Sequence, residues 1–399
     1  MSAFSKSRLG RLGHVMAGHV AEGRVPGVVA LVSRRGESHV DALGTLALGG
    51  PAMSRDTIFR IASMTKPVVA VAALILVEEC RLRLDEPVDR WLPELADRRV
   101  LRRLEGPVED TVPAERAITL RDLLTFRAGF GLVMAPPGTY PIQGAMAAQG
   151  LRMGPPRPQG EPAPDEWIRR LTPLPLVHQP GAQWMYDTAA DALGVLIARA
   201  AGRPLETFLR ERIFEPLGMK DTAFSVPAPK LARFAASYAT DSTTGGLALY
   251  DPPAGGEWSR PPAFPSGAGG LVSTADDYLA FGRMLLDGGR YAGGRILSRP
   301  SVAAMTTDQL TAEQKARSVF VPGFWDDRGW GFGVSIATRR TGLSAPGRFG
   351  WDGGLGTSWA SDPAEDLVGV LLTQRLWDSP VPPPVYVDFW TLAYQAIDD

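Results

Sequence analysis

The fold of this chain is decided by the stretch Ser63-Met64-Thr65-Lys66-Pro67-Val68-Val69-Ala70-Val71-Ala72-Ala73-Leu74-Ile75-Leu76-Val77. From Pro67 onward it would be apolar on nearly all sides of a helix, which indicates a helix that is buried on most sides. The residues before it, Thr57-Ile58-Phe59-Arg60-Ile61, have the β-branched and aromatic composition of a strand. The sequence therefore predicts that a strand leads through a turn at Ser63 into a buried central helix.

Ser63 and Lys66 have side chains that can work together at this turn. A serine hydroxyl is a weak nucleophile at neutral pH and needs a base to take its proton. Residues three apart lie on the same helix face, so Lys66 would stand one turn above Ser63. Free N–H groups at the helix start could stabilise an oxyanion. A serine at a helix start is more often just an N-cap, so the motif alone is weak, but in this context it indicates a serine hydrolase that forms an acyl-enzyme.

The composition narrows the possible functions. Of the 399 residues, 45% are hydrophobic and 21% are charged, which is ordinary for a globular protein with an extensive core. The net charge is −1 and no basic run stands out, so neither nucleic acid nor an anionic membrane surface is expected as a partner. We expect a small substrate that is not highly charged.

The cysteine count and the apolar segments bear on the cellular compartment. Cys80 is the single cysteine of the sequence, which excludes an intrachain disulfide and a cysteine metal cluster. Because it follows the apolar run, it is predicted to be a buried structural thiol. Residues 1–25 lack the continuous apolar segment of a signal peptide, and the run from Pro67 to Val77 is too short to span a bilayer. The expected location is cytoplasmic.

The order of the predicted elements indicates how the chain is organised. Strand patterns occur at 27–33, 39–46, 330–337, 348–351, 357–361 and 366–373. Helical patterns occur at 5–23, 118–124 with Thr119 as N-cap, 189–201, 205–213, 278–286 with Ser273 or Thr274 as N-cap, and 385–397. Strands at both ends imply that the two ends share one sheet. We expect an α/β domain from residues 1–80 plus 265–399, and a mostly helical insertion at 81–264.

Two Pro- and Gly-rich stretches, 136–175 and 251–265, interrupt these patterns. A long stretch of this kind inside a compact domain is either a functional lid or a disordered loop. The sequence leaves both alternatives open.

Other catalytic machineries fit the sequence poorly. No G-x-S-x-G nucleophile elbow is present, and none of the histidines lies in the late loop that an α/β-hydrolase requires; they are His14, His19, His39 and His178. Scattered histidines and one cysteine give no paired spacing for a metal, and no nucleotide-binding fingerprint occurs, so no cofactor is expected. The base is expected to be Lys66 or a tyrosine.

Three motifs, in order along the chain, resemble those of serine β-lactamase-like proteins: Ser63-Met64-Thr65-Lys66, Tyr186-Asp187-Thr188 and Trp351-Asp352-Gly353. The segments 123–130, 214–222 and 267–277 are also similar, and the resemblance covers roughly residues 20–395. It points to class C β-lactamases, DD-peptidases and, most closely, family VIII carboxylesterases. It implies an α+β fold with an antiparallel sheet flanked by helices and a mostly helical inserted domain.

The resemblance also implies catalytic roles. Ser63 would be the nucleophile, Lys66 its proton acceptor or electrostatic partner, and Tyr186 the second acid/base group. A neighbouring cation favours the phenolate, whereas a desolvated pocket favours neutral lysine. One shared proton could therefore move among the three side chains, and which of Lys66 and Tyr186 is the base stays open.

The third motif is expected to line the substrate pocket with Trp351, Gly353 and Gly354. The family arrangement implies that the N–H groups of Ser63 and of Gly354 or its neighbour form the oxyanion hole. Two departures from the β-lactamase pattern bear on the substrate. Thr188 replaces the asparagine that holds a substrate amide, and Trp351 replaces the lysine that faces a β-lactam carboxylate.

These observations favour a carboxylesterase that cleaves small or short-chain esters through a Ser63 acyl-enzyme, with a small-molecule ester as its partner. Alternatives on the same scaffold are an acyltransferase or an amide hydrolase, such as a D-aminopeptidase, an aminohexanoate-oligomer hydrolase or a β-lactam hydrolase. A non-catalytic sensor with the penicillin-binding fold is a further alternative, against which the intact Ser63, Lys66 and Tyr186 argue. The oligomeric state does not follow from the sequence.

Overall fold

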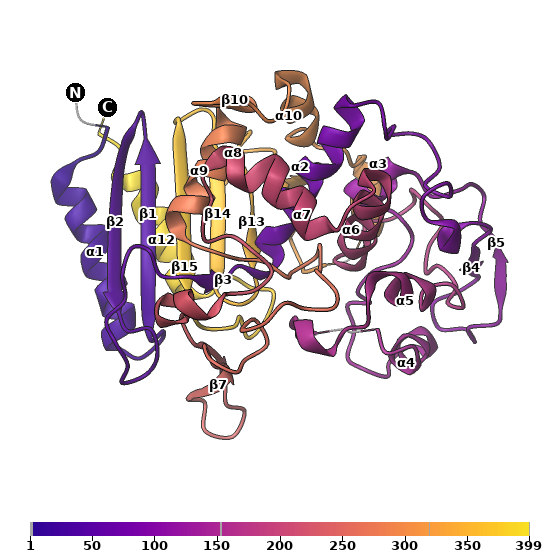
Figure 1. Cartoon of the computed structure of the whole chain (residues 1–399), viewed down its shortest axis with the longest axis horizontal. Coiled ribbons are helices and arrows are strands. Elements are labelled where there is room, and N and C mark those ends of the chain that lie inside the picture. Colours follow the sequence, from indigo (N-terminus) through magenta and orange to yellow (C-terminus); the bar gives the residue numbers. More distant parts are fainter. Residues whose placement is uncertain (1–2, 152–153, 319, 399) are drawn as a thin grey trace.

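The computed structural model describes residues 3–151, 154–318 and 320–398, and its central element is one antiparallel sheet built from both ends of the chain (Figure 1). The strand order is β11 (Arg328–Trp330), β12 (Ser335–Ala337), β13 (Phe349–Gly353), β14 (Thr357–Asp362), β15 (Leu367–Thr373), β1 (Gly27–Arg34) and β2 (Glu37–Gly44). The two ends meet where β1 pairs with β15, with Leu31 opposite Val370. The expected sharing of one sheet is thus confirmed, while the domain boundaries stay a prediction.

The helices lie on both faces of this sheet and in a lobe beside it (Figure 1). The longer ones are α1 (Lys6–Ala21), α2 (Thr65–Glu78), α4 (Pro141–Ala148), α6 (Thr188–Ala201), α9 (Ala275–Leu286) and α12 (Pro384–Gln395). The shorter ones are α3 (Leu120–Leu124), α5 (Pro164–Arg169), α7 (Leu205–Leu209), α8 (Glu215–Leu217), α10 (Arg299–Met305) and α11 (Ala312–Arg317).

Short turns and two-stranded ladders complete the framework. The 3-10 turns are η1 (Ala62–Met64), η2 (Pro93–Leu95), η3 (Pro158–Gly160) and η5 (Ala228–Arg233), and η4 (Arg210–Phe214) is a π-helical turn. The ladders pair β3 (Phe59–Arg60) with β8 (Val272–Ser273), β4 (Arg99–Leu101) with β5 (Thr111–Pro113), β6 (Ser237–Thr240) with β7 (Leu247–Asp251), and β9 (Arg290–Tyr291) with β10 (Gly294–Arg295).

Strand β1 is buried along its whole length because helices cover both faces of the sheet. Successive side chains of a strand point to opposite faces. Val28 and Val32 accordingly pack in a core with α1 and α12, whereas Val29 and Leu31 belong to the larger core that contains α2 and α9. The apolar residues of α2 are buried from Val68 to Leu76, so the prediction of a buried central helix is confirmed.

Two predicted elements are interrupted in the structure. The stretch 330–337 forms two strands instead of one, the edge strand β11 and its neighbour β12, because a turn at Gly331 to Val334 separates them and Gly333 adopts a positive φ of 68°. The helix expected at 205–213 ends at Leu209 and continues as the π-helical turn η4. Neither break changes the sheet or the core.

The prediction that Cys80 is buried is wrong, because its side chain is exposed. Helix α2 ends at Glu78, and Cys80 follows in a left-handed conformation with φ of 57°. Its N–H donates to the carbonyl of Val77, an arrangement typical of a helix C-terminus. The chain therefore turns out of the core just before the thiol.

The two Pro- and Gly-rich stretches lie against each other. The first contains α4, η3 and α5, and its residues 152–153 lie outside the described residues. Gln159 connects it to the second stretch: its backbone N–H donates to the Glu257 carboxylate at 2.8 Å, and its side-chain amide donates to the carbonyls of Glu257 at 2.8 Å and Arg260 at 3.1 Å. Much of the first stretch is thus helical and held by specific contacts.

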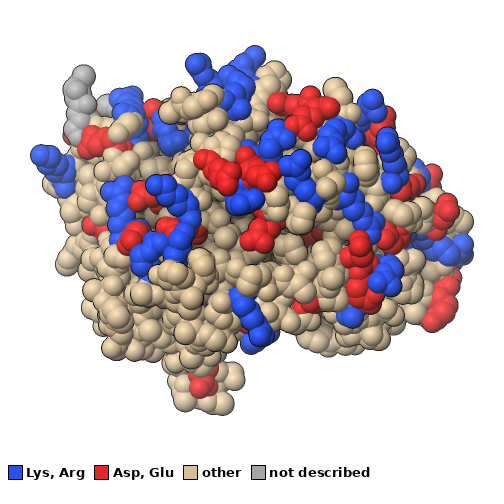
Figure 2. All heavy atoms as spheres, in the orientation of Figure 1, with Lys and Arg blue, Asp and Glu red and all other residues tan. Residues whose placement is uncertain are grey.

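The charged side chains and the lengths of the helices bear on possible contacts with membranes or charged partners. Figure 2 shows basic and acidic side chains interspersed over the face that it draws, with wide areas free of either. In the part of the chain that the structure describes, no helix has the length and apolar character needed to cross a membrane.

Candidate active site

Ser63 lies in the turn η1 between β3 and α2, and its side chain is partly exposed. The residue before it, Ala62, has a positive φ of 43°, a conformation that costs a non-glycine residue about 1–3 kcal/mol. Contacts from distant segments hold the turn. Tyr278 donates its hydroxyl proton to the carbonyl of Met64 at 2.6 Å, and Thr357 donates to the carbonyl of Ile61 at 3.2 Å. The serine is therefore presented at a fixed position.

Lys66 lies in the first turn of α2 and is buried. Its Nζ donates to Ser63 Oγ at 3.0 Å, to Asp187 Oδ1 at 2.5 Å and to the carbonyl of Ala268 at 2.7 Å. An ammonium has three N–H donors, and these contacts use all of them. Burial opposes the charge, but the charges of Asp187, Tyr186 and Asp191 and the hydrogen bond to Asp187 together outweigh it, so the pKa of Lys66 is raised above its ordinary value. The geometry therefore fits a protonated lysine.

Asp187 was not singled out from the sequence as a site residue. It precedes α6 and has a φ of 84° and a ψ of −77°, which turns its half-buried carboxylate toward Lys66. Positive φ is uncommon outside glycine, although aspartate tolerates it better than most residues. In the sequence, Asp187 could have been noticed because it lies between Tyr186 and Thr188 of the second motif. Its contact with Lys66, however, depends on a backbone conformation that the motif does not specify.

The Tyr186 hydroxyl lies between the nucleophile and the third motif. Trp351 donates its indole N–H to this oxygen at 2.8 Å, and the hydroxyl also hydrogen-bonds with Ser63. Lys66 Nζ lies 4.5 Å from the centroid of the tyrosine ring. Burial raises the pKa of Tyr186 above its ordinary value and outweighs the Lys66 charge and the hydrogen bonds of Ser63 and Trp351, which lower it. The structure thus brings Ser63, Lys66 and Tyr186 into one cluster.

Trp351 is part of this cluster, and its indole N–H donates to the Tyr186 oxygen. Only 7% of its surface is exposed, and its ring packs against Tyr186 at 5.6 Å and against Trp330 at 4.7 Å between centroids. The expectation that Trp351 lines the substrate pocket stays a prediction. The indole N–H is committed to the Tyr186 oxygen.

The two glycines of the third motif differ in their surroundings. A Cβ on Gly353 would lie 2.3 Å from the carbonyl oxygen of Ile61 and 2.2 Å from Thr357 Oγ1, so glycine lets β13 approach the nucleophile turn. A Cβ on Gly354 would have no atom within 4 Å, and this residue is exposed at the end of the strand. Gly354 is thus open to a ligand, and the oxyanion hole formed by its N–H and that of Ser63 stays a prediction.

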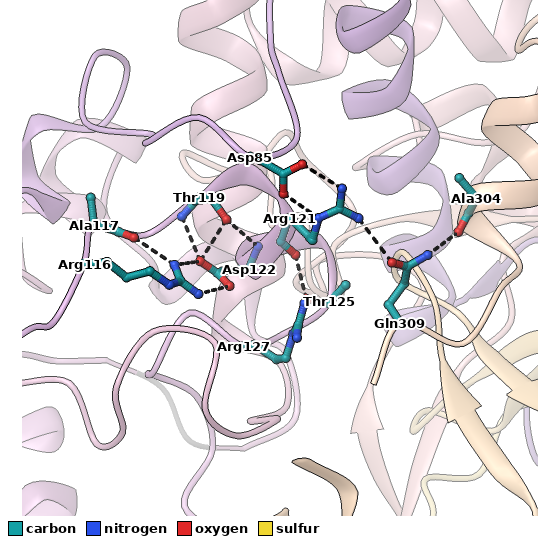
Figure 3. Close-up of polar contacts among 10 residues, drawn as sticks. All are labelled: Asp85, Arg116, Ala117, Thr119, Arg121, Asp122, Thr125, Arg127, Ala304 and Gln309. Carbon is teal, nitrogen blue, oxygen red and sulfur yellow. Dashed lines mark hydrogen bonds and ion pairs between the residues drawn. The ribbon is translucent and has the colours of Figure 1, made fainter. Parts of the chain in front are cut away.

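Helix α3 and the loop after it support the tyrosine. Thr119 caps the helix as predicted, and the buried carboxylate of Asp122 accepts hydrogen bonds from Thr119 and from the Arg116 guanidinium (Figure 3). Beyond the helix, the Phe126 carbonyl accepts from the N–H of Met185 at 2.8 Å, and the N–H of Leu132 donates to the Tyr186 carbonyl at 2.8 Å. The backbone on both sides of Tyr186 is thus fixed by the loop after α3.

A second chain of contacts in Figure 3 connects α3 to the region of β11. Arg121 donates to both oxygens of Asp85, at 2.6 and 2.9 Å, and to the side-chain oxygen of Gln309 at 3.2 Å. Gln309 in turn donates to the carbonyl of Ala304 at 3.0 Å. The helical lobe is therefore tied to the segment that leads into the edge of the sheet.

Asp191, in the first turn of α6, positions the acceptor of the lysine. Its Oδ1 accepts from the Ser266 hydroxyl at 2.7 Å and from the N–H of Ala268 at 2.9 Å, and the Ala268 carbonyl accepts from Lys66. Burial, together with the nearby charge of Asp187, raises the pKa of Asp191 to about 7. Asp191 therefore acts through the loop at 266–268 and does not contact Ser63 directly.

The histidines lie outside this cluster. His14 and His19 are on α1, and His39 is on β2, where it pairs with Asp41. Burial lowers the pKa of His178 to about 4, so this side chain is neutral at physiological pH. Among the described residues, no group of three or more His, Cys, Asp or Glu side chains is arranged to hold a metal.

Comparisons with known proteins agree with this arrangement. The family model described as Beta-lactamase matches residues 12–382. Protein Rv1367c of Mycobacterium tuberculosis is 42% identical over 364 residues, covering 89% of this chain and 87% of that protein. Esterase EstB of Burkholderia gladioli is 32% identical over 391 residues, covering 92% and 91%. The solved structure of EstCE1, described as a hydrolase with promiscuous acyltransferase activity, shares the fold with a TM-score of 0.78 at 24% identity, covering 97% and 99%.

Proposed function

The chain belongs to the β-lactamase family, and on this basis we propose that it is a serine carboxylesterase of the family VIII type that hydrolyses small or short-chain esters. The observation that carries the proposal is the Ser63 Oγ to Lys66 Nζ distance of 3.0 Å beside the Tyr186 hydroxyl. The similarity to Esterase EstB supports an ester as the substrate. The proposal includes a cytoplasmic location and a small-molecule ester as the partner.

In the proposed mechanism, Lys66 remains an ammonium and Tyr186 accepts the proton of Ser63. The three acceptors around Lys66 Nζ, one of them a carboxylate, favour its charged form. Burial raises the pKa of Tyr186, and the Lys66 charge and the indole N–H of Trp351 act against this shift, so they favour the phenolate that acts as general base. Ser63 Oγ attacks the ester carbonyl carbon, and Tyr186 returns the proton to the departing alkoxide oxygen. A water molecule, activated by the same tyrosine, then hydrolyses the acyl-enzyme.

The oxyanion of each tetrahedral intermediate would be stabilised by backbone N–H groups. Ser63 and Gly354 are the proposed donors, since Gly354 faces open space next to the nucleophile turn. Such donors act where charge develops, and removing one typically costs about 10²–10³-fold in kcat.

The chain's second and third motifs favour an ester over a β-lactam. Thr188 occupies the position of the asparagine whose side-chain amide holds a substrate amide in β-lactamases, and its own side chain is buried at the start of α6. Trp351 occupies the position of the lysine that faces a β-lactam carboxylate, and its indole N–H donates to the Tyr186 oxygen. A lactam carboxylate held there would lack a cationic partner, and an unpaired charge in a water-poor site costs several kcal/mol. A neutral ester has no such requirement.

The experiment that tests the proposal compares substrates on one enzyme preparation. We expect kcat/KM for p-nitrophenyl acetate or butyrate to exceed that for nitrocefin by at least about 10²-fold, or roughly 2.7 kcal/mol in transition-state stabilisation. Ser63→Ala is the control and should abolish turnover of both. Equal or better efficiency on nitrocefin would restore the β-lactam hydrolase, preference for an amide analogue would favour the amidase, and binding without turnover of any substrate would favour the sensor.

A further inference from the structure

A cavity of about 90 Å³ lies behind the strand that carries the third motif. Its wall includes Arg348, which directly precedes β13, and Gly350 and Asp352 of that strand; residues two apart in extended chain lie on one face of the sheet. Tyr386 of α12 closes it from the same face and hydrogen-bonds with Asp352. Trp351 also belongs to the lining, and its indole N–H donates to the Tyr186 oxygen. The cavity therefore adjoins the Ser63 cluster through Trp351, but Ser63, Lys66 and Tyr186 are not among its lining residues.

Arg348 presents an unpaired guanidinium to this cavity. Its guanidinium carbon lies 4.0 Å from the centroid of the Trp390 ring, so the group is held by stacking. Its Nε is buried and has no hydrogen-bond partner. Within residues 3–151, 154–318 and 320–398, the structure gives this guanidinium no hydrogen bond and no ion pair. A partly buried cation of this kind requires an anionic or hydrogen-bonding partner.

A second arginine on the cavity wall is also weakly paired. Arg328 Nε lies 3.8 Å from Asp327 Oδ1, which is longer than a hydrogen bond, and its guanidinium lies 5.3 Å from the Phe324 ring centroid. The carboxylate of Asp352 is instead occupied by Ser358, whose hydroxyl donates to it at 2.8 Å. The third arginine of the lining, Arg339, donates its Nε–H to the carbonyl of Asp326 at 2.6 Å, so Arg328 and Arg348 are the two guanidiniums left to bind a ligand.

The charges around the cavity indicate the charge of the ligand. The lining contains three arginines and two aspartates, which leaves one positive charge; they are Arg328, Arg339, Arg348, Asp327 and Asp352. A single water molecule needs about 10–15 Å³ of such space, so the cavity has room for an ion of a few heavy atoms. The planar guanidinium matches the two oxygens of a carboxylate or phosphate.

We propose that this cavity binds a small singly charged oxyanion, a carboxylate or a phosphate, between the guanidiniums of Arg328 and Arg348. The anion would complete the hydrogen bonding of the Arg348 Nε and neutralise the excess positive charge of the lining. Because Arg348 directly precedes β13, the site would lie on the back of the strand whose Trp351 contacts Tyr186. This inference does not depend on which substrate Ser63 attacks.

Isothermal titration calorimetry with the full chain tests the site. Sodium acetate and sodium phosphate are titrated separately at constant ionic strength, with sodium chloride as the nonspecific control. We expect saturable binding of at least one oxyanion with a Kd on the order of 1 mM or lower, and none of chloride. Arg348→Met keeps an unbranched chain over Trp390 without the donors, and binding should weaken at least about tenfold. The matched control is Arg290→Met on the exposed strand β9, which should bind as the wild type does.

Each arm of this experiment can overturn the proposal. Absence of saturable binding to both oxyanions in the wild type would do so, as would unchanged affinity in Arg348→Met or an equal loss in Arg290→Met. If Arg348→Met loses its cooperative thermal transition, Arg328→Gln takes its place, and wild-type affinity in that variant would equally exclude the site. Acetate binding tighter than phosphate would identify a carboxylate as the ligand, and the reverse order a phosphate.

Discussion

Lys66 is the residue on which the electrostatics of the site depend. Its Nζ contacts the nucleophile, a carboxylate and a backbone carbonyl, and it is buried. Asp187 is the strongest of the influences that favour its charge. A protonated Lys66 can stabilise both a Ser63 alkoxide and a Tyr186 phenolate, so the charge is useful throughout the proposed reaction.

In Asp187→Asn, we expect esterase activity to be lost at a lower alkaline pH than in the wild type. The carboxylate raises the pKa of Lys66, so its removal lowers that pKa, and the lysine loses its proton at a lower pH. We expect the falling alkaline limb of kcat/KM for an ester to move down by about 1–3 pH units, the usual effect of one close opposite charge. Asparagine keeps the size and an acceptor oxygen. An alkaline limb that stays in place would show that the activity does not require the Lys66 charge.

Trp351→Phe should impair the tyrosine while leaving the aromatic packing largely in place. The change removes the N–H that the Tyr186 oxygen accepts at 2.8 Å, a hydrogen bond that lowers the pKa of this tyrosine. The phenolate then forms at higher pH, so the rising limb of the kcat/KM profile should shift upward. The rate at neutral pH should fall about tenfold, as expected for one hydrogen bond to a developing charge. A profile identical to the wild type would exclude this role for the indole.

Some of these residues follow from the sequence and others do not. The spacing of Ser63 and Lys66 predicts their contact because helix geometry alone places residues three apart on one face. The contact of Asp187 could not be predicted, since it depends on a backbone φ of 84°. The partner of the Trp351 indole was missed for a similar reason, because only the folded chain brings β13 next to the segment before α6.

At the scale of elements, the site is built from the starts of two helices and the end of one strand. Helix α2 carries Lys66, α6 begins directly after Asp187, and β13 carries Trp351. The loop at 266–268 completes the arrangement through the Ala268 carbonyl, and Asp191 of α6 holds this loop by two hydrogen bonds. The loop conformation therefore depends on one buried carboxylate.

Asp191→Asn should change how stability depends on pH. The folded state raises the pKa of Asp191 from 3.8 to about 7, so the native chain retains this proton where the unfolded chain has lost it. The resulting stabilisation is present at low pH and is lost progressively as the pH rises from about 4 to about 7. Asparagine accepts the same hydrogen bonds but does not titrate.

Urea unfolding of both proteins at a series of pH values measures this effect. The free energy of unfolding of the wild type minus that of Asp191→Asn should decrease between pH 4 and pH 7 and then level off. A difference that is constant over this range would show that Asp191 titrates normally in the folded protein.

The elements were predicted well where one physical signal dominates. The apolar run predicts α2, and the caps Thr119 and Thr274 mark the starts of α3 and α9. The predictions failed where the conformation of a single residue decides where an element ends. Gly333 splits the predicted edge strand into β11 and β12, and the left-handed Cys80 turns out of the core. Composition and periodicity do not report such local conformations.

At the scale of the whole molecule, distant parts of the chain meet at one turn. β3, just before Ser63, pairs with β8, and Arg60 of β3 forms a buried ion pair with Asp251 at the end of β7. Gly353 of β13 approaches the same turn closely enough to exclude any side chain. The sequence indicates that both ends form one sheet, but these contacts across more than a hundred residues follow only from the folded chain.

Ser63 is the proposed nucleophile of the acyl-enzyme, and this role is tested by treating the protein with a fluorophosphonate and locating the adduct by intact-protein and peptide mass spectrometry. We expect one covalent adduct, located on the peptide that contains Ser63, with loss of esterase activity in proportion to labelling and no adduct in Ser63→Ala. An adduct that persists in Ser63→Ala, with its mass on Ser344 or Ser358, would contradict it.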